Sequence, residues 1–251
     1  MSKKVNAIAN GFEILKCLSK HSDMIGVTEV SRQTGISPSS CFNMLRTLVD
    51  LGYATFDSKT KRYGFGLGIF VLANGSAEKH NPVLRSFQPL LIELAKKHKT
   101  HCSLWEIVNH DSPTLVAIGE STMPLRISLQ IGTTQSIGSG SVGRACLSMR
   151  NDNKQFIREA FSEVSWQGEI TFDEYLDQIK TTANVGYSID QDQYFLGMTT
   201  LSTPFIEEST DRWFTLTMIC LSGAEDDDSL NAKGTELKQK VLELGYSSNL
   251  N

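Results

Sequence analysis

The sequence predicts an α+β chain in which a small N-terminal domain of helices and one hairpin precedes a larger domain, whose mostly antiparallel sheet is flanked by helices. Charge separates along the chain: residues 1–80 hold ten Lys and Arg against six Asp and Glu, whereas residues 81–251 hold fourteen against twenty-two. Apolar residues repeat at helical spacing in the first 80 residues, and helical segments alternate with strand-like segments after them.

The composition restricts the class of protein. Apolar residues make up 40% and charged residues 21% of the chain, as in globular proteins. The longest apolar run, residues 67–73, is too short to cross a bilayer, and we expect no signal peptide. The five cysteines are widely spaced without a Cys-x-x-Cys pair, which indicates buried reduced thiols and a cytoplasmic location.

Three helices are expected before residue 52. The first is predicted by apolar residues on one face, namely Ile8, Phe12, Leu15 and Leu18. The second should begin with Thr28 as its N-cap and end at Gly35. In the third, Ser37 can cap the helix, Pro38 suits its first position, and Gly52 ends it.

The third helix has an apolar stripe from Cys41 to Leu48, which must pack on the first two helices. Its opposite face carries short hydrogen-bonding side chains and one guanidinium, which fit the major groove of DNA. Ser39 and Ser40 lie where exposed amides suit a phosphate, and Asn43 and Arg46 are expected to contact base edges. Any amphipathic helix has a polar face, so this face alone does not separate DNA binding from a solvated surface.

Two short strands, 53–56 and 62–65, follow this helix with a basic tip between them. A basic hairpin alone is usually only solvated, but helix, helix, turn, helix and basic hairpin in this order are typical of a winged helix-turn-helix. We therefore predict a DNA-binding domain over residues 1–68. The residues expected to contact DNA are Thr28, Ser37, Ser39, Ser40, Asn43, Arg46, Thr47, Lys59, Lys61 and Arg62.

These segments resemble the IclR family of bacterial regulators. The resemblance rests on Thr28-Glu29-Val30 before Gly35, on residues 36–53 and on residues 63–68. Asn43 departs from it, since many members carry arginine there, so no operator preference is transferred. The resemblance implies a linker helix that helps dimerise, assigned to residues 69–81, in a homodimer or tetramer. From the sequence alone this segment could equally be the last helix of the DNA-binding domain. The resemblance also implies an effector-binding domain over residues 82–251.

The second domain is expected to contain both helices and strands. A long amphipathic helix is predicted over 82–98, and the sequence Thr171 to Glu174 forms a capping box that opens another helix. Further strands are predicted at 103–108, 114–118, 125–131, 198–203 and 214–221, and further helices at 144–149, 155–161 and 230–244.

The run 138–143 matches the dinucleotide fingerprint, but no Val- and Ile-rich strand precedes it. Arg144-Ala145 also stands where a triphosphate-binding loop needs Lys and a hydroxyl. The loop instead suits a carboxylate at a helix N-terminus, so we expect a small anionic metabolite. A nucleotide-dependent enzyme and a winged-helix module that binds protein remain alternatives. We expect no metal or cofactor, because His98, His101 and Cys102 lack a second ligand pair. We expect no catalytic activity, because the sequence has no nucleophile elbow of the form G-x-S-x-G and no Ser-His-Asp arrangement.

The resemblance also implies the residues that line an effector pocket. A second family-like run spans 186–197, in which an early acidic residue and the positions after the last glycine contact the ligand; Gln193 stands where the family usually has glutamate. The residues that the resemblance assigns to the pocket come from this run and the positions after it, from the glycine-rich loop and from a later strand. They are Ile137, Ser139, Gly140, Asp190, Met198, Thr200, Cys220 and Ser222.

Overall fold

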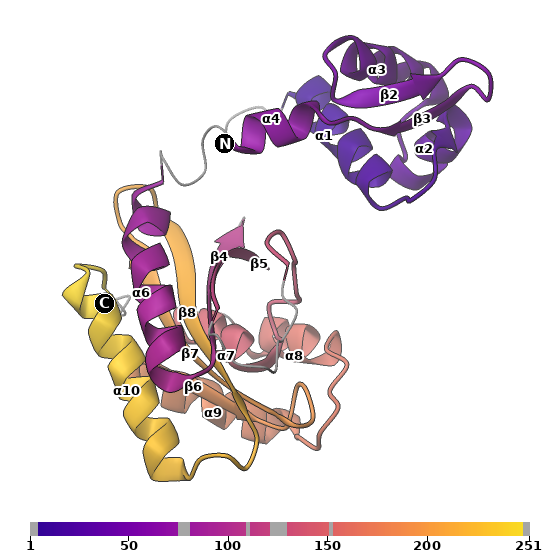
Figure 1. Ribbon diagram of the computed structural model, residues 1–251. Helices are drawn as coiled ribbons and strands as arrows, with labels where there is room; N and C mark the ends of the chain where they lie inside the picture. Colours follow the sequence, from indigo (N-terminus) through magenta and orange to yellow (C-terminus); the bar gives the residue numbers. More distant parts are fainter. Residues whose placement is uncertain (1–4, 75–80, 109–110, 121–129, 151–152, 248–251) are drawn as a thin grey trace. The chain divides into compact units, whose positions relative to one another are not determined.

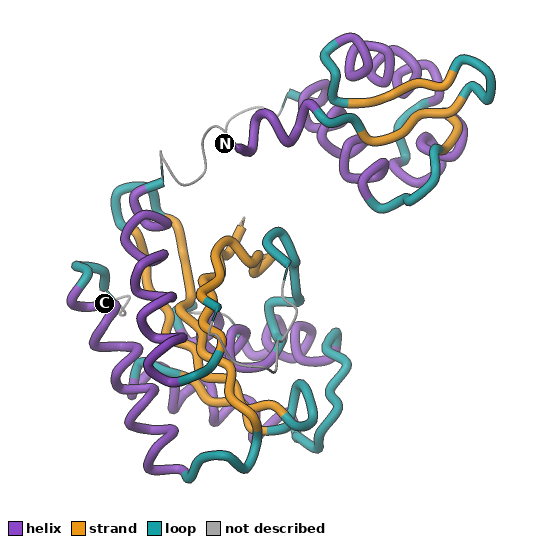
Figure 2. The backbone as a smooth tube through the Cα atoms, viewed as in Figure 1, coloured by secondary structure: helices purple, strands orange, loops and turns teal. Residues whose placement is uncertain are grey.

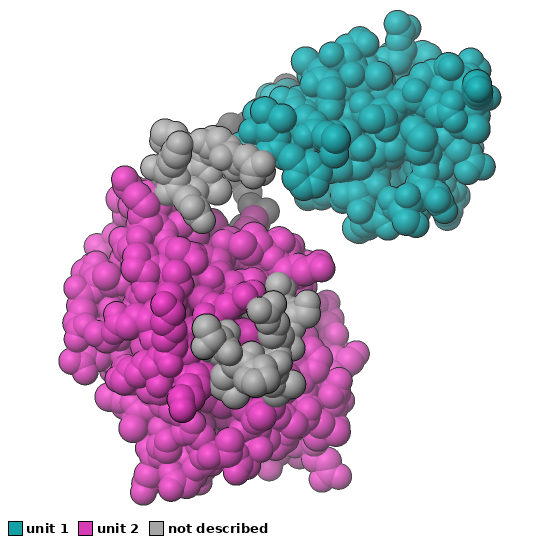
Figure 3. Space-filling model, viewed as in Figure 1, with its two compact units in different colours: residues 1–80 teal, residues 81–251 magenta. Residues whose placement is uncertain are grey.

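The computed structural model describes residues 5–74, 81–108, 111–120, 130–150 and 153–247, and the chain forms two compact units, residues 1–80 and 81–251 (Figure 3). Residues 75–80 of the expected linker helix and 125–129 of the expected strand lie outside the described residues. Gln130 and Ile131, at the end of that expected strand, are not in a strand. Among the helices that are described, none is long and apolar enough for a membrane span.

The first unit combines helices with a small antiparallel sheet in the order β1-β3-β2 (Figure 1). The strand β1 is only two residues long, too short to show an alternating hydrophobic pattern, and it was not predicted. The elements are α1 (Asn6–Ser19), β1 (Ile25–Gly26), α2 (Val27–Thr34), α3 (Pro38–Asp50), β2 (Ala54–Asp57), β3 (Arg62–Phe65) and α4 (Gly68–Asn74).

Most local signals in this unit are confirmed. Gly35 ends α2 with a φ of 70°, Ser37 caps α3, and Pro38 is its first residue. The prediction that Thr28 is an N-cap is wrong, because α2 already begins at Val27 and has no side-chain cap. Cys41, Leu45 and Leu48 of α3 pack against buried residues of α1 and α2, among them Ile14, Leu18 and Val30.

The predicted apolar face of α1 is correct only toward its C-terminal end. Leu15 and Leu18 are buried, whereas Ile8 is 62% exposed and Phe12 is 60% exposed. Burial of Ile14 and Cys17 in place of Ile8 and Phe12 means that the core face of α1 is rotated from the predicted stripe. Two large apolar side chains of α1 are therefore left on the surface.

The second unit contains an antiparallel sheet in the order β5-β4-β8-β7-β6. The predicted helix over 82–98 has these bounds, and the capping box at Thr171 is present. The short strand β6 was missed. The elements are α6 (Pro82–His98), β4 (His101–Val108), β5 (Ser112–Gly119), α7 (Gly140–Ser148), α8 (Lys154–Ser162), α9 (Phe172–Val185), β6 (Ser188–Gln191), β7 (Met198–Glu207), β8 (Arg212–Leu221) and α10 (Asp227–Glu243).

This sheet lies between two layers of helices (Figure 2). On one face, Leu216 and Met218 of β8 pack with α6 and α10, for example with Leu94 and Leu237. On the other face lie α7, α8 and α9. Since successive side chains of a strand point to opposite faces, residues 215, 217 and 219 of β8 face the α7 side. This alternation decides which strand residues reach the pocket described below.

Candidate nucleic-acid interface and ligand pocket

The polar face of α3 is open to solvent. Ser39, Asn43, Arg46 and Thr47 are exposed, and Ser40 is half-buried. Their backbone is held by the buried opposite face of the helix, so their position depends on the core of the first unit. The arrangement leaves a guanidinium and an amide on consecutive turns, which are the groups that form paired hydrogen bonds with bases.

At the start of α3, Ser37 and Ser40 are hydrogen-bonded to each other. The Ser37 hydroxyl accepts from the Ser40 amide at 3.4 Å and donates to the Ser40 hydroxyl at 2.9 Å. Farther along, the Thr47 hydroxyl donates to the Asn43 carbonyl at 3.1 Å, while the amide side chain of Asn43 stays exposed. Thr28, which was expected to join this surface, is exposed on α2.

The hairpin between β2 and β3 is shaped by Asp57. Its carboxylate accepts from the Lys59 amide at 2.8 Å and from the Thr60 hydroxyl at 2.6 Å. The Thr60 hydroxyl and then the Lys59 amide hold the pKa of Asp57 below its usual value. Lys61 takes up a φ of 57°, and all three predicted cations of the hairpin, Lys59, Lys61 and Arg62, are exposed.

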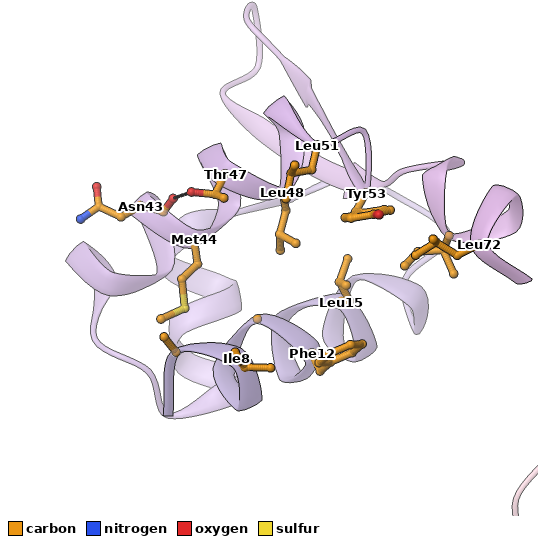
Figure 4. Close-up of a pocket in the computed structure, with 13 residues that line it drawn as sticks. Ile8, Phe12, Leu15, Asn43, Met44, Thr47, Leu48, Leu51, Tyr53 and Leu72 are labelled. Carbon is orange, nitrogen blue, oxygen red and sulfur yellow. Dashed lines mark hydrogen bonds between the residues drawn. The ribbon is translucent and has the colours of Figure 1, made fainter. Parts of the chain in front are cut away.

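A large apolar groove of about 490 Å³ is lined by residues of α1, α3 and α4 in this unit (Figure 4). Ile8, Phe12 and Leu15 of α1 face Met44 and Leu48 of α3 across it. Leu72 of α4 stands at one end and Asn43 at the other. We call it the apolar groove. The exposed Ile8 and Phe12 thus belong to one continuous surface.

The second unit has a pocket of about 220 Å³ at the start of α7, which we call the α7 pocket. Its walls combine aromatic rings, hydroxyls and helix backbone, and no charged side chain is found among the described residues that line it. These residues are Trp105, Thr133, Thr134, Gln135, Ser139, Gly140, Ser141, Val142, Tyr194, Phe195, Met198, Thr200, Thr217 and Ile219.

Four hydroxyls form a chain beside the α7 pocket. Ser141 donates to Thr200 at 2.7 Å and lies 2.9 Å from Ser202, which in turn lies 2.8 Å from Thr217. Ser202 is fully buried, whereas Thr200, Ser141 and Thr217 line the pocket. The chain therefore connects one part of the pocket wall to another through the protein interior.

The glycines at and just before the start of α7 allow close packing of backbone. A Cβ on Gly138 would lie 2.3 Å from the Ala160 carbonyl oxygen, and one on Gly143 would lie 2.4 Å from the Gly138 carbonyl carbon. The Gly138 carbonyl also accepts from the Tyr175 hydroxyl at 2.8 Å. The run does not follow a strand of a parallel sheet, which a dinucleotide fingerprint requires. Gly138 instead fits this loop against α8, and Gly143 fits α7 against the loop.

The structure brings only part of the predicted effector set to the α7 pocket. Ser139, Gly140, Met198 and Thr200 line it. The other four predicted residues are not among those that line the pocket: Ile137, Asp190, Cys220 and Ser222.

Each of these four differences has a physical cause. Cys220 packs on the α6 and α10 side, because strand alternation turns it away from Ile219. Ile137 belongs to the core between the sheet and α7, α8 and α9. Ser222 lies just beyond β8, with its hydroxyl 3.1 Å from that of Thr199.

Asp190 binds protein groups. Its Oδ2 accepts from Arg144 Nη1 at 2.7 Å, with the two side chains 2% and 0% exposed, and its Oδ1 accepts from the Tyr194 amide at 3.1 Å. Arg144 also donates to Gln178 and Gln193, and its guanidinium carbon lies 5.0 Å from the Tyr175 ring centroid. Asp190 is thus a buried counter-ion that holds the loop before β7.

The aromatic part of the α7 pocket was not predicted from the sequence. Tyr194 and Phe195 lie inside the run 186–197, which was singled out for its acidic and glycine positions only. Trp105 comes from β4, and Ser141 comes from the glycine-rich run. Two aromatic residues within a loop bounded by glycines were a signal that could have indicated Tyr194 and Phe195. The place of Trp105 in the pocket could be found only once the pairing of β4 with its neighbours was known.

Two family models match the chain: the IclR helix-turn-helix domain over residues 7–58 and the bacterial transcriptional regulator IclR C-terminal domain over residues 76–224. The transcriptional regulator KdgR of Dickeya chrysanthemi is 24% identical over 208 residues, which are 81% of this chain and 67% of that protein.

Solved structures share the fold. An IclR-type regulator from Alicyclobacillus acidocaldarius has a TM-score of 0.76 at 18% identity, covering 96% of this chain and 98% of that one. An IclR homologue from Microbacterium hydrocarbonoxydans, complexed with 4-hydroxybenzoate, has a TM-score of 0.68 at 13% identity, covering 95% and 97%. Because the C-terminal model alone spans more than half of the residues, the chain belongs to the IclR family of DNA-binding bacterial transcriptional regulators.

Proposed function

We propose that this regulator binds an operator as a homodimer and that a small anionic metabolite in the α7 pocket controls this binding. The observation that carries the proposal is the start of α7, which opens into a pocket lined by hydroxyls and aromatic rings. The first amides of a helix have no acceptor within the helix, and Ser139 makes no side-chain cap. These amides can therefore bind a carboxylate.

The composition of the α7 pocket supports a ring-shaped ligand that carries hydroxyls. Trp105 and Tyr194 offer aromatic surface, while Thr200 and Thr217 offer hydrogen bonds. The absence of acidic side chains from the described lining favours an anion over a cation. A hydroxylated aromatic acid, the class to which the 4-hydroxybenzoate bound by the Microbacterium homologue belongs, fits these features.

The operator contacts are assigned by exposure and chemistry. Asn43 and Arg46 would contact base edges from α3, and Ser39 with Ser40 would contact a phosphate at its N-terminus. The exposed hairpin cations would contact the backbone beside α3. Thr28, Ser37 and Thr47 are kept as further contacts of the same surface.

A second copy of the chain is the proposed occupant of the apolar groove. Ile8 and Phe12, at 62% and 60% exposure, and Leu72, at 57%, are costly to leave in water. Pairing two first units would place two α3 helices on one duplex. Sedimentation of the full chain tests this: Phe12→Ser should shift it toward the monomer, whereas Leu242→Ser, an exposed leucine of α10, should not.

The ligand proposal is tested by thermal unfolding of the full chain with 4-hydroxybenzoate, its uncharged analogue 4-hydroxybenzyl alcohol, and NAD. An anion in the pocket should raise the unfolding temperature, because a ligand at 100 times its Kd stabilises by about 2.7 kcal/mol. The effect should be absent in Ser141→Trp, which fills the pocket.

The outcomes separate the alternatives. Stabilisation by aromatic acids but not by the alcohol supports the proposal, and the same acid should change operator affinity. Equal stabilisation by the alcohol would contradict an anionic ligand, and stabilisation by NAD would favour the nucleotide-dependent enzyme. DNA affinity that does not fall with rising salt would favour a protein-binding winged helix.

A further inference from the structure

A cleft of about 290 Å³ lies between α3 and the wing strands β2 and β3, apart from the apolar groove. We call it the aromatic cleft. Phe42 of α3 is 44% exposed and Phe56 of β2 is 41% exposed, whereas Tyr63 of β3 is buried. The rings of Phe56 and Tyr63 are 4.8 Å apart. Packing thus explains Tyr63 but leaves Phe42 facing solvent.

The exposed Phe42 ring lies on the part of α3 that is expected to contact DNA. Phe42 lies in the first half of α3, one residue before Asn43 and one turn before Arg46. The Arg46 guanidinium carbon is 6.0 Å from the Phe42 ring centroid. Phe42 is therefore the exposed aromatic ring on the segment of this family's DNA-binding unit that is expected to enter the major groove.

The charges around the aromatic cleft fit DNA at one end. Arg46 lies beside Phe42, and the Lys61 ammonium is 6.0 Å from the Phe56 ring centroid. Asp50 lies at the C-terminal end of α3 and would repel a phosphate. A strand of DNA is thus favoured over the Phe42 end of the cleft, where one cation lies beside each exposed ring.

The major groove presents one apolar group to such a ring, the 5-methyl group of thymine. We propose that Phe42 is a specificity-determining residue that contacts the 5-methyl group of a thymine in the operator. The contact adds to the hydrogen bonds assigned to Asn43 and Arg46, and it rests on the proposed role of α3 in the major groove. It predicts a position where thymine is preferred over cytosine and over uracil.

The test uses the full-length protein and a duplex selected by it from a random pool. Each thymine of the selected duplex is replaced in turn by deoxyuridine, which lacks only the methyl group. Loss of one buried methyl group should weaken binding by about fourfold at the contacted position. The variants are Phe42→Ala, Phe42→Leu and, as a matched exposed apolar residue outside the first unit, Leu242→Ala.

The proposal is supported if one thymine shows this penalty in the wild type and in Leu242→Ala, a smaller one in Phe42→Leu and none in Phe42→Ala. It is overturned if no thymine is sensitive to its methyl group, or if Phe42→Ala keeps the same penalty. A change in sedimentation of Phe42→Ala without DNA would also overturn it, because the ring would then contact a second copy. If no duplex is enriched at all, the proposed DNA-binding role of α3 fails as well. This outcome is distinct from failure of the Phe42 contact alone, in which a duplex is enriched but shows no methyl-dependent position.

Discussion

Replacement of Asp190 by alanine should strongly destabilise the second unit, because it leaves the fully buried Arg144 without its counter-ion. Removing one partner of a buried ion pair costs about 3–5 kcal/mol. Gln178 and Gln193 still accept from Arg144, and the Tyr175 ring remains under its guanidinium, so we expect the lower end, about 3 kcal/mol. The Tyr194 amide also loses its acceptor, but this residue is half-exposed and water can replace the carboxylate.

Urea unfolding followed by tryptophan fluorescence measures this change. Trp105, Trp166 and Trp213 are the three tryptophans of the chain, and all lie in the second unit. The signal therefore follows that unit, and the midpoint multiplied by the slope gives the free energy of unfolding.

The matched control is Asp111→Ala. Asp111 also pairs with an arginine, Arg150, at 3.2 Å, but its side chain is 63% exposed. Arg150 is 16% exposed, but removal of the exposed carboxylate leaves its guanidinium open to water on that side, so this variant should lose only about 0–1 kcal/mol and unfold nearly as the wild type does. Asp190→Ala that costs no more than Asp111→Ala would refute the argument. Arg144→Met combined with Asp190→Leu should recover part of the loss, since no buried charge remains.

Four further predictions concern single groups. Arg46→Ala should weaken binding to the selected operator by about 1–3 kcal/mol, and unchanged affinity would remove Arg46 from the contact surface. Gly138→Ala should lower the free energy of unfolding of the second unit by about 1–3 kcal/mol, because its Cβ would meet the Ala160 carbonyl oxygen; urea unfolding at the wild-type value would contradict this. Burial raises the thiol pKa of Cys102 and Cys146, so a thiol reagent at pH 8 should modify them only after unfolding, as mass spectrometry would detect. The hydrogen bond from Arg32, followed by that from Gln33, lowers the pKa of Glu29 to about 2, so its stabilising effect is present above its ordinary pKa and is lost as the pH falls toward 2. The difference in calorimetric unfolding temperature between wild type and Glu29→Gln should accordingly shrink over that interval, and a difference that persists at pH 2 would contradict the assignment.

The sequence predicted what local chemistry determines. The cap at Ser37, the left-handed Gly35 and the capping box at Thr171 act within a few residues, so their positions follow from the sequence alone. Thr28 was misplaced as a cap by two positions, since the N-cap is Gly26, a typical error at helix ends.

Longer-range features could not be predicted in this way. The role of Asp190 depends on Arg144, 46 residues earlier, and the orientation of Cys220 depends on the face that β8 presents to α7. The strands β1 and β6 are two and four residues long and exist because β3 and β7 pair with them. Four of the eight residues that the family resemblance implies line the α7 pocket, and the sheet register determines which strand side chains reach it.

The hydroxyl chain from Thr200 through Ser141 and Ser202 to Thr217 has a further consequence for ligand choice. Each hydroxyl carries one proton, and Ser141 donates its proton to Thr200. Ser202 must therefore donate to Ser141, and Thr217 to Ser202. The chain thus leaves the Thr200 proton free for a ligand and leaves lone pairs at Thr217. A ligand that reaches both ends would accept at Thr200 and donate at Thr217, which favours a phenol over its ether.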